Sequence, residues 1–353
     1  MREKKAGCKS LFQGLILCFL FVSTSALNAQ TYSIDKVRSD FKTLLQRPLV
    51  DPKPSIQSFP TDSVLIEKGF FYSEATEKVP IIIYKPIGSG IKKLPVVICL
   101  HGTGGSKDGD EITKLLYRFS QIGFMAISID GRYHGERVKT TSYVEAITQA
   151  WQNTNANKQA HPFYLDTVYD LWRLLDYIST RPDVDSNRIG MMGISKGGIE
   201  TWMAASVDTR IKVAVPIIAV QSFKWSLENN KWQGRARTIW GAHVQAAKDL
   251  GDTGVNRKNV KAVWDKLIPG ITSEFDCPSM IRLFAPRPLL LLNTENDPNC
   301  PLPGAKLAFE AATNIYKEQN ALDKLKIDVE PGEPHRFTKK HMEMTIEWFK
   351  QWL

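Results

Sequence analysis

The pentapeptide G-I-S-K-G at 193–197 has the residue types and spacing best suited to covalent chemistry in this chain. It directly follows the apolar run 189–192 and leads into a helix-like segment, 198–206. A serine on such a sharp strand-to-helix turn holds its hydroxyl clear of the sheet, and the turn is tight enough to require glycine two residues to either side. The pattern predicts Ser195 as a nucleophile.

A serine hydroxyl is a weak nucleophile until a base takes its proton. Of the six histidines, His335 lies between the last expected strand and the last expected helix, where a side chain can reach over the serine. His341 falls inside that helix and is expected at the surface, while His161 and His243 are expected in or near loops and have no partner motif. We therefore predict His335 as the general base.

The group that orients this histidine is expected in the loop after the apolar run 289–292. That loop contains N-T-E-N-D-P at 293–298. Asp297 is the first choice for the orienting acid, and Glu295 is the alternative. The order along the chain is then serine, acid, histidine.

The negative oxygen that develops during attack on a carbonyl needs N–H donors. The loop H-G-T-G-G at 101–105 follows a buried apolar run, and its glycines allow close approach of the backbone to a ligand. We predict the backbone N–H groups of Thr103 and Lys196 as the oxyanion donors. His101 is expected to brace the loop.

A second loop, D-G-R-Y-H-G-E-R at 130–137, follows the next expected strand. Arg132 and His134 are candidate substrate-binding residues there. The alternative, which we favour, is a hydrogen-bonded scaffold in which Asp130 pairs with Arg132.

Short apolar runs alternate with segments of helical spacing along the chain. This alternation predicts an α/β fold with a mostly parallel, doubly wound sheet and helices on both faces. Sites in such sheets lie at the carboxyl ends of the strands, where every motif above falls. Strands are expected at 64–72, 79–84, 95–100, 124–129, 188–192, 211–220, 289–292 and 325–329, and helices at 110–122, 167–180, 198–206, 305–316 and 337–353.

Almost seventy residues separate the sixth of these strands from the seventh. We expect an inserted cap there, over about 221–284, with four tryptophans and basic residues between them. Tryptophan can stack on sugar rings, so Trp225 and Trp232 are predicted to bind substrate. Arginine or lysine in the cap can hold a carboxylate. The alternative is that the tryptophans form the cap's own small core.

The first 29 residues have a basic start, an apolar segment at 11–22 and a small, polar end, which is typical of a secretory signal peptide. Cleavage is expected after Ala29, or alternatively after Ala26, and an uncleaved anchor is the minority alternative. The segment is too short for a comfortable membrane span. We predict a secreted or periplasmic protein with no stable membrane span after cleavage, an N-terminal extension at 30–62 and a main domain at 63–353.

Charge and cysteine content exclude other classes of protein. Without the leader the net charge falls from +9 to +6, with no Lys/Arg block typical of nucleic-acid binders. No Cys/His cluster has metal-ligand spacing, so neither a metal nor an organic cofactor is predicted. Cys99 is expected to pack in the core; spacing leaves open whether Cys277 and Cys300 pair. The oligomeric state is also left open.

These motifs resemble those of α/β-hydrolases. The branch they resemble is shared by acetyl xylan esterases, dienelactone hydrolases and the catalytic domain of prolyl oligopeptidases. The resemblance covers about residues 63–353 and includes A-P-R-P-L-L-L-L…N-D-P-x-C-P from 285 to 301. The chain differs from dienelactone hydrolases in having serine at the elbow, and from the peptidases in having no room for a propeller. Asn293 and Pro334 stand where glycine is common.

The resemblance implies a secreted serine esterase that works through an acyl-enzyme and removes acetyl or related groups from plant-type polysaccharide. Its partner is then an ester substrate, an acylated oligo- or polysaccharide. A general carboxylesterase and a peptidase of the prolyl oligopeptidase type are the enzyme alternatives. A binding protein on a hydrolase scaffold is the non-enzyme alternative, and it would need a broken triad.

Overall fold

The computed structural model describes residues 32–353 apart from 89–92, 139 and 156–157. The expected signal peptide and both of its cleavage sites lie outside the described residues. In the part of the chain that is described, no helix has the length and apolar character needed to cross a membrane.

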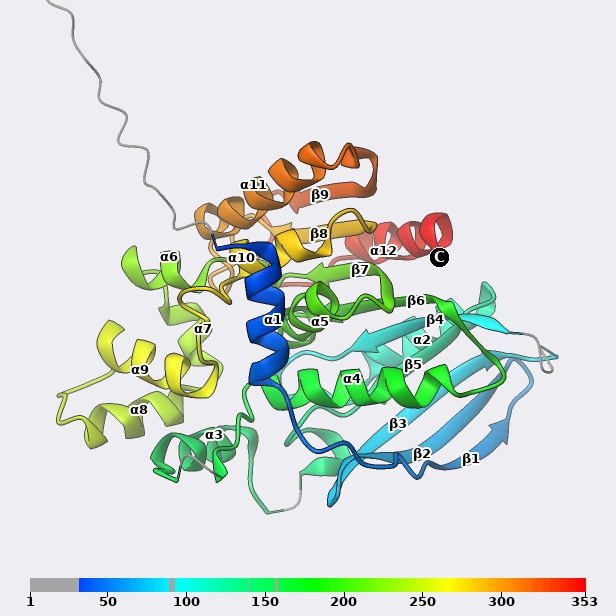
Figure 1. Ribbon diagram of the computed structural model, residues 1–353, viewed down its shortest axis with the longest axis horizontal. Coiled ribbons are helices and arrows are strands. Elements are labelled where there is room, and N and C mark those ends of the chain that lie inside the picture. Colours follow the sequence, from blue (N-terminus) through cyan, green and yellow to red (C-terminus); the bar gives the residue numbers. More distant parts are fainter. Residues whose placement is uncertain (1–31, 89–92, 139, 156–157) are drawn as a thin grey trace, which may run out of the picture. The chain divides into compact units, whose positions relative to one another are not determined.

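A sheet of nine strands, counted over the described residues, forms the centre of the fold in the order β1-β2-β3-β5-β4-β6-β7-β8-β9 (Figure 1). The pairs from β1 to β5 are antiparallel, and all later pairs are parallel. The strands are β1 Ser55–Pro60, β2 Val64–Glu74, β3 Glu77–Pro86, β4 Leu94–Leu100, β5 Met125–Ile129, β6 Val184–Ile194, β7 Ile211–Ile217, β8 Leu289–Thr294 and β9 Leu325–Glu330.

Helices cover both faces of this sheet, which explains why every residue of β4 and β5 is buried. One apolar core includes side chains of α1, α4, α5 and α11, and a second includes side chains of α2 and α12. The predicted α/β fold class is confirmed. The helices are α1 Ile34–Leu44, α2 Asp110–Gln121, α3 Tyr143–Gln152, α4 Leu165–Ser179, α5 Lys196–Val207, α11 Leu302–Glu318 and α12 Lys339–Trp352.

The segment 32–62 adds two elements that the sequence pattern did not predict. Phe41 of α1 is fully buried, with its ring 5.1 Å from that of Phe275 and 6.2 Å from that of Trp172. β1 is the edge strand, antiparallel to β2. Because its side chains are mostly exposed, it lacks the alternation that identifies a half-buried strand. The added strand shifts the count, so the insertion lies between β7 and β8.

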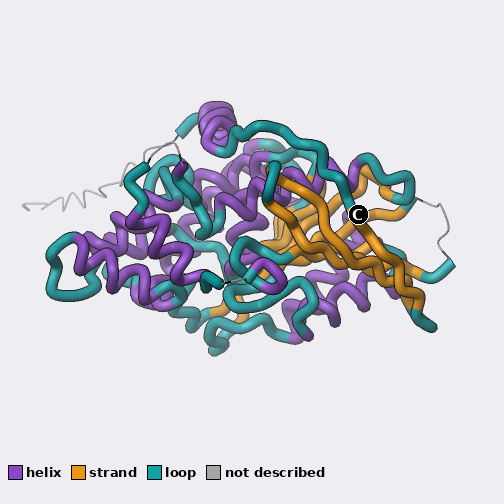
Figure 2. Tube along the Cα trace, turned by 90° about the horizontal axis from the view of Figure 1, so that it is seen from below, coloured by secondary structure: helices purple, strands orange, loops and turns teal. Residues whose placement is uncertain are grey.

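The insertion is helical (Figure 2), and it packs beside α3 (Figure 1). Trp264 is fully buried in it, with its ring edge-on to Phe223 at 5.1 Å. These contacts indicate that Trp264 packs in the core of the insertion. The helices of the insertion are α6 Phe223–Glu228, α7 Gln233–Arg237, α8 Trp240–Asp249, α9 Arg257–Leu267 and α10 Cys277–Ile281.

Two histidines differ from their expected surroundings. His341 is buried, and its Nε2 lies 3.0 Å from Oδ2 of Asp328 on β9, so the expected surface position is wrong. The apolar spacing of α12 alone does not show that the helix face carrying His341 packs on the sheet. His243 is buried within α8, and neither of its ring nitrogens has a hydrogen-bond partner among the described residues.

His243 makes the stability of the cap dependent on pH. Burial lowers the pKa of His243 to about 4, against about 6.5 in the unfolded chain. As the pH falls from 6.5 to 4, the unfolded chain therefore binds a proton that the folded chain does not, and the free energy of unfolding decreases.

Acidification lowers the free energy of unfolding of the wild type. We predict that His243→Leu removes up to about 3 kcal/mol of that decrease. Urea unfolding of both proteins at pH 7 and pH 4.5 measures it. Any packing change affects both pH values equally, so the difference between them isolates the titration. Parallel pH profiles for the two proteins would contradict the prediction.

Candidate active site

Ser195 occupies the turn between β6 and α5 with φ 55° and ψ −110°, a conformation that non-glycine residues rarely adopt. The glycines around it are required by close contacts. A Cβ on Gly193 would lie 2.1 Å from the carbonyl oxygen of Gly197, and a Cβ on Gly197 would lie 2.5 Å from that of Leu100. No larger side chain fits, so the G-x-S-x-G spacing follows from the tightness of the turn.

Ser195, His335 and Asp297 form a continuous hydrogen-bonded chain. The Oγ of Ser195 lies 2.8 Å from Nε2 of His335, and Nδ1 of His335 lies 2.7 Å from Oδ2 of Asp297. A carboxylate only accepts, so Nδ1 carries the proton and Nε2 is free to accept from the serine hydroxyl. The three side chains come from the carboxyl ends of β6, β8 and β9.

Backbone donors hold Asp297 in place. Its Oδ1 accepts from the N–H groups of Asn299 at 2.7 Å and Cys300 at 3.0 Å, which leaves Oδ2 for the histidine. The alternative acid, Glu295, points elsewhere and accepts from the N–H of Gly332 at 2.8 Å. Of the two candidate acids, the structure brings Asp297 to His335.

Asp297, Cys300 and His335 also offer ligand atoms within 4.8 Å of one another. Burial raises the pKa of the Cys300 thiol well above its usual range, so it is a neutral thiol and a poor metal ligand. Its sulfur lies 3.1 Å from the donor Nη2 of Arg235, and the thiol donates to the carbonyl of Ile218 at 3.2 Å. These groups are committed to hydrogen bonds and do not fit a metal.

The cysteine pairing left open by the sequence has a definite outcome. Cys277 and Cys300 are both buried free thiols. Cys99 is also a buried free thiol, as expected for a side chain packed in the core of β4.

Two backbone segments border Ser195 where an oxyanion would form. Lys196 is the first residue of α5, where backbone N–H groups have no acceptor within the helix. A Cβ on Gly102 would lie 3.7 Å from Cβ of Ser195, so the loop after β4 passes close by. Thr103 is exposed in this loop, in a turn closed by the N–H of Gly105 donating to Gly102 at 3.1 Å.

His101 links the two glycine-rich loops. Its Nδ1 donates to the carbonyl of Gly102 at 2.8 Å, and its Nε2 accepts from the N–H of Gly131 at 3.1 Å. Burial, with a further contribution from the Lys196 charge, lowers the pKa of His101 well below its ordinary value. A neutral imidazole with both nitrogens engaged is suited to the expected bracing role.

The side chain of Lys196 forms a buried ion pair that the sequence interpretation missed. Its Nζ lies 2.7 Å from Oε1 of Glu200, and each side chain is 1% exposed. Burial raises the pKa of Glu200, and the Lys196 charge opposes that rise. A Cβ on Gly131 would lie 2.5 Å from Nζ, so the lysine reaches beneath the loop after β5. The i,i+4 spacing on α5 was the available signal.

The expected pair between Asp130 and Arg132 is wrong. Asp130 instead accepts from the N–H groups of Lys107 at 2.8 Å and Glu136 at 3.0 Å. Arg132 turns toward α4, where its Nε and Nη2 each lie 2.9 Å from Asp170. The scaffold role favoured for this loop is therefore filled by partners distant in sequence.

His134 is part of the same scaffold. Its Nδ1 lies 2.8 Å from the carbonyl oxygen of Arg132, and its ring centre lies 4.5 Å from that of Tyr143 and 5.1 Å from that of His101. Burial, with help from the Lys196 charge, lowers the pKa of His134 to about 3. These contacts favour a structural role over contact with substrate for Arg132 and His134.

The two cap tryptophans predicted to bind substrate differ in exposure. Trp232 is 6% exposed, and its indole N–H donates to Asn230 at 3.0 Å. Trp225 is partly exposed and packs closely on Gly304, where a Cβ would lie 2.8 Å from its ring. This burial favours the alternative interpretation of Trp232 as part of the cap's core.

Together, the sheet order, the strained serine turn and the Ser–His–Asp chain define an α/β-hydrolase. A model of the acetyl xylan esterase (AXE1) family matches residues 46–224, about half of the chain. The chain therefore belongs to the acetyl xylan esterase family, and the resemblance drawn from its motifs is confirmed.

Individual relatives are more distant. The chain is 24% identical over 186 residues to the putative hydrolase YtaP of Bacillus subtilis, a match covering 53% of each protein. It is 21% identical over 269 residues to the putative esterase YitV of the same organism, covering 74% of this chain and 91% of that protein. The match thus spans only about half the length of YtaP.

Solved structures share the fold. The methylesterase BT1017 superimposes with a TM-score of 0.65 at 19% identity, covering 90% of this chain and 63% of that one. An acetyl xylan esterase from Paenibacillus sp. R4 also has a TM-score of 0.65 at 19% identity, covering 92% and 96%. At this identity the likeness concerns the fold.

We predict that Glu200→Gln lowers the free energy of unfolding by about 3 kcal/mol or more, because it leaves the buried Lys196 ammonium without its counter-charge. The matched control is Glu228→Gln. It breaks the i,i+4 pair of Lys224 and Glu228, whose side chains are more than half exposed, and should change stability by less than about 1 kcal/mol.

Urea unfolding measures both variants. The double variant Lys196→Met/Glu200→Leu removes both charges and should recover most of the loss. Equal effects from the buried and the exposed glutamine variants would contradict the assigned ion pair.

Proposed function

We propose that this protein is a serine esterase that removes acetyl or related acyl groups from carbohydrate through an acyl-enzyme. The observation that carries the proposal is the hydrogen-bonded chain from Ser195 through His335 to Asp297 in a member of the acetyl xylan esterase family. A binding protein on the same scaffold would not need this chain intact.

In the first half of the reaction, Nε2 of His335 takes the proton of Ser195 as its Oγ attacks the ester carbonyl. The N–H groups of Thr103 and Lys196 hold the oxyanion that forms. The C–O bond to the leaving sugar hydroxyl then breaks, and His335 gives that oxygen its proton. Asp297 holds the imidazole in the required tautomer and stabilises its charged form.

In the second half, a water molecule takes the place of the leaving alcohol. His335 removes a proton from the water as it attacks the acyl-enzyme carbonyl, and the same N–H donors hold the second oxyanion. The bond to Oγ breaks, Ser195 regains its proton, and the carboxylic acid leaves. The residues named here balance every proton transfer in the cycle.

Family membership and the neighbours support an ester of carbohydrate as the substrate. The similar structures include an acetyl xylan esterase and a methylesterase. We further propose that the protein acts outside the cytoplasm, on the strength of the basic, apolar and small-residue pattern of 1–29.

Acetate release from acetylated xylan tests the proposed reaction. We expect release by the wild type and a loss of at least about a thousandfold in kcat for Ser195→Ala, with an unchanged melting temperature. p-Nitrophenyl acetate, a long-chain p-nitrophenyl ester and a peptide are assayed separately as comparison substrates. A higher kcat/KM on the peptide or long-chain ester than on acetylated xylan would refute the carbohydrate assignment.

Asp297→Asn tests the identity of the acid. We expect kcat to fall about a thousandfold to ten-thousandfold, because an amide cannot hold the histidine tautomer that accepts the serine proton. The matched control is Glu295→Gln, in a carboxylate of the same loop that contacts Gly332 and not the histidine. Similar losses from both variants, measured with p-nitrophenyl acetate, would contradict the assignment.

A further inference from the structure

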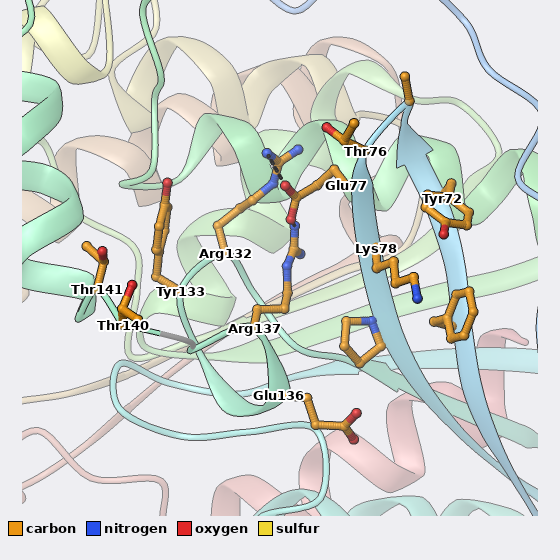
Figure 3. A pocket seen from close by; sticks show the side chains of 13 residues that line it. Tyr72, Thr76, Glu77, Lys78, Arg132, Tyr133, Glu136, Arg137, Thr140 and Thr141 are labelled. Carbon is orange, nitrogen blue, oxygen red and sulfur yellow. Dashed lines mark hydrogen bonds and ion pairs between the residues drawn. The ribbon is translucent and has the colours of Figure 1, made fainter.

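A cavity of about 770 Å³ lies between the β2–β3 hairpin and the loop after β5 (Figure 3). We call it the hairpin pocket. Among its lining residues are Phe70, Tyr72, Lys78, Tyr133, Glu136 and Thr141. None of these residues belongs to the Ser195–His335–Asp297 chain.

The hairpin pocket lies at the same edge of the sheet as the candidate active site. β3 is antiparallel to β5 with Ile81 opposite Ile129, so the hairpin turn lies beside the carboxyl end of β5. In the order β3-β5-β4-β6, three strand spacings separate the hairpin from the strand that ends at Ser195, or about 15 Å. A short oligosaccharide can span that distance.

One loop separates the two places. The loop at 130–137 lines the hairpin pocket with Tyr133 and also carries His134, whose ring packs against that of His101. The loop braced by His101 passes Ser195 in turn. A chain that leaves the serine along this edge therefore meets the pocket after crossing a rigid, hydrogen-bonded ridge.

The charges at the base of the pocket are compensated. Arg132 lies 2.9 Å from Asp170 and also contacts Glu74, while Arg137 contacts Asp170 at 2.7 Å and pairs with Glu77. Figure 3 shows Arg132 and Arg137 close to Glu77. Arginines held in this way have little capacity left for a substrate carboxylate, which favours an uncharged ligand.

The walls combine aromatic rings with hydroxyl groups. Tyr133 and Tyr72 stand on opposite sides of the pocket, with Thr140 and Thr141 beside the former (Figure 3). Nζ of Lys78 lies 4.3 Å from the ring centre of Phe70, so part of this wall is covered by a cation–π contact. Aromatic faces with a few polar groups suit a sugar ring, which has an apolar face and hydroxyl edges.

Tyr133 keeps its ring at the pocket in spite of the backbone. Its φ of 59° lies in the left-handed region, which is strained for a bulky side chain and better suited to glycine or asparagine. A tyrosine at this position is consistent with a use for the ring.

We propose that the hairpin pocket is a subsite for an uncharged, unesterified sugar unit of the same glycan chain whose acyl group is at Ser195. The inference rests on the proposed function and deepens it. The pocket selects for length, since a glycan too short to reach it loses the aromatic contacts.

Isothermal titration of the intact protein with ester-free xylo-oligosaccharides tests the subsite without any ester chemistry. We expect xylohexaose to bind at least about tenfold more tightly than xylobiose, and tetragalacturonic acid to bind more weakly than xylohexaose. The proposal would be overturned if xylohexaose bound no more tightly than xylobiose. It would also be overturned if tetragalacturonic acid bound more tightly than xylohexaose.

Tyr133→Asn removes the ring and suits the left-handed backbone. We expect it to weaken xylohexaose binding about tenfold, whereas Tyr133→Phe keeps most of the affinity. The matched control is Tyr117→Asn, in an exposed tyrosine of α2 that does not line the hairpin pocket. Equal weakening by Tyr133→Asn and Tyr117→Asn would contradict the subsite. If Tyr133→Asn fails to fold, Tyr72→Ala replaces it with the same expectation.

The outcomes separate the two proposals. Xylohexaose binding that depends on Tyr133, in a protein that releases no acetate, would defeat the proposed function and leave the hairpin pocket as a sugar-binding site unconnected with ester cleavage. Acetate release by a protein whose affinity for xylo-oligosaccharides depends neither on chain length nor on Tyr133 would defeat the subsite alone.

Discussion

The turn at Ser195 is the constraint on which the rest of the site depends. The carbonyl oxygens of Gly197 and Leu100 lie where a Cβ on Gly193 or Gly197 would be, so the start of α5 can approach β4 and β6 only if those positions are glycine. This approach places the N-terminus of α5 at the carboxyl edge of the sheet, beside the loop after β4. The same edge receives the loops after β8 and β9, which carry the acid and the base. These two close contacts therefore hold the serine at the edge where groups from four strands meet.

Burial also decides which histidine can act as a base. His101 and His134 both lie near the Lys196 ammonium, and burial together with that charge lowers the pKa of each. Both ring nitrogens of His101 and Nδ1 of His134 serve to position backbone groups. His335 is the imidazole that faces a carboxylate at one nitrogen and the serine hydroxyl at the other. The Asp297 and Ser195 contacts therefore select His335 as the base, while the lowered pKa values of His101 and His134 make those imidazoles weaker proton acceptors.

The sequence predicted the parts that local geometry determines and missed those that depend on distant partners. The serine turn, the buried strands and the loops after them have short-range signatures, and the structure brings Ser195, Asp297 and His335 together as expected. β1 has no such signature, because an exposed edge strand shows no apolar alternation. Arg132 was expected to pair with Asp130, but it pairs with Asp170, which lies on α4. The burial of His341 depends on the packing of α12 on the sheet and on its contact with Asp328 of β9, which the helical pattern does not encode.

The loop at 130–137 borders both the active site and the hairpin pocket, and the arginine cluster beneath it explains why it can do so. Although burial opposes it, Arg132 and Arg137 hold the pKa of the fully buried Asp170 well below its usual range. Burying such charges costs desolvation energy, and apolar residues of the same volume would often be as stable. What apolar packing lacks is direction: the arginines bind Asp170 on α4 and Glu74 and Glu77 at the hairpin at once. These ion pairs thereby hold α4, the loop at 130–137 and the hairpin in fixed positions relative to one another. The ridge beside Ser195 and the wall of the hairpin pocket are then faces of a single rigid element.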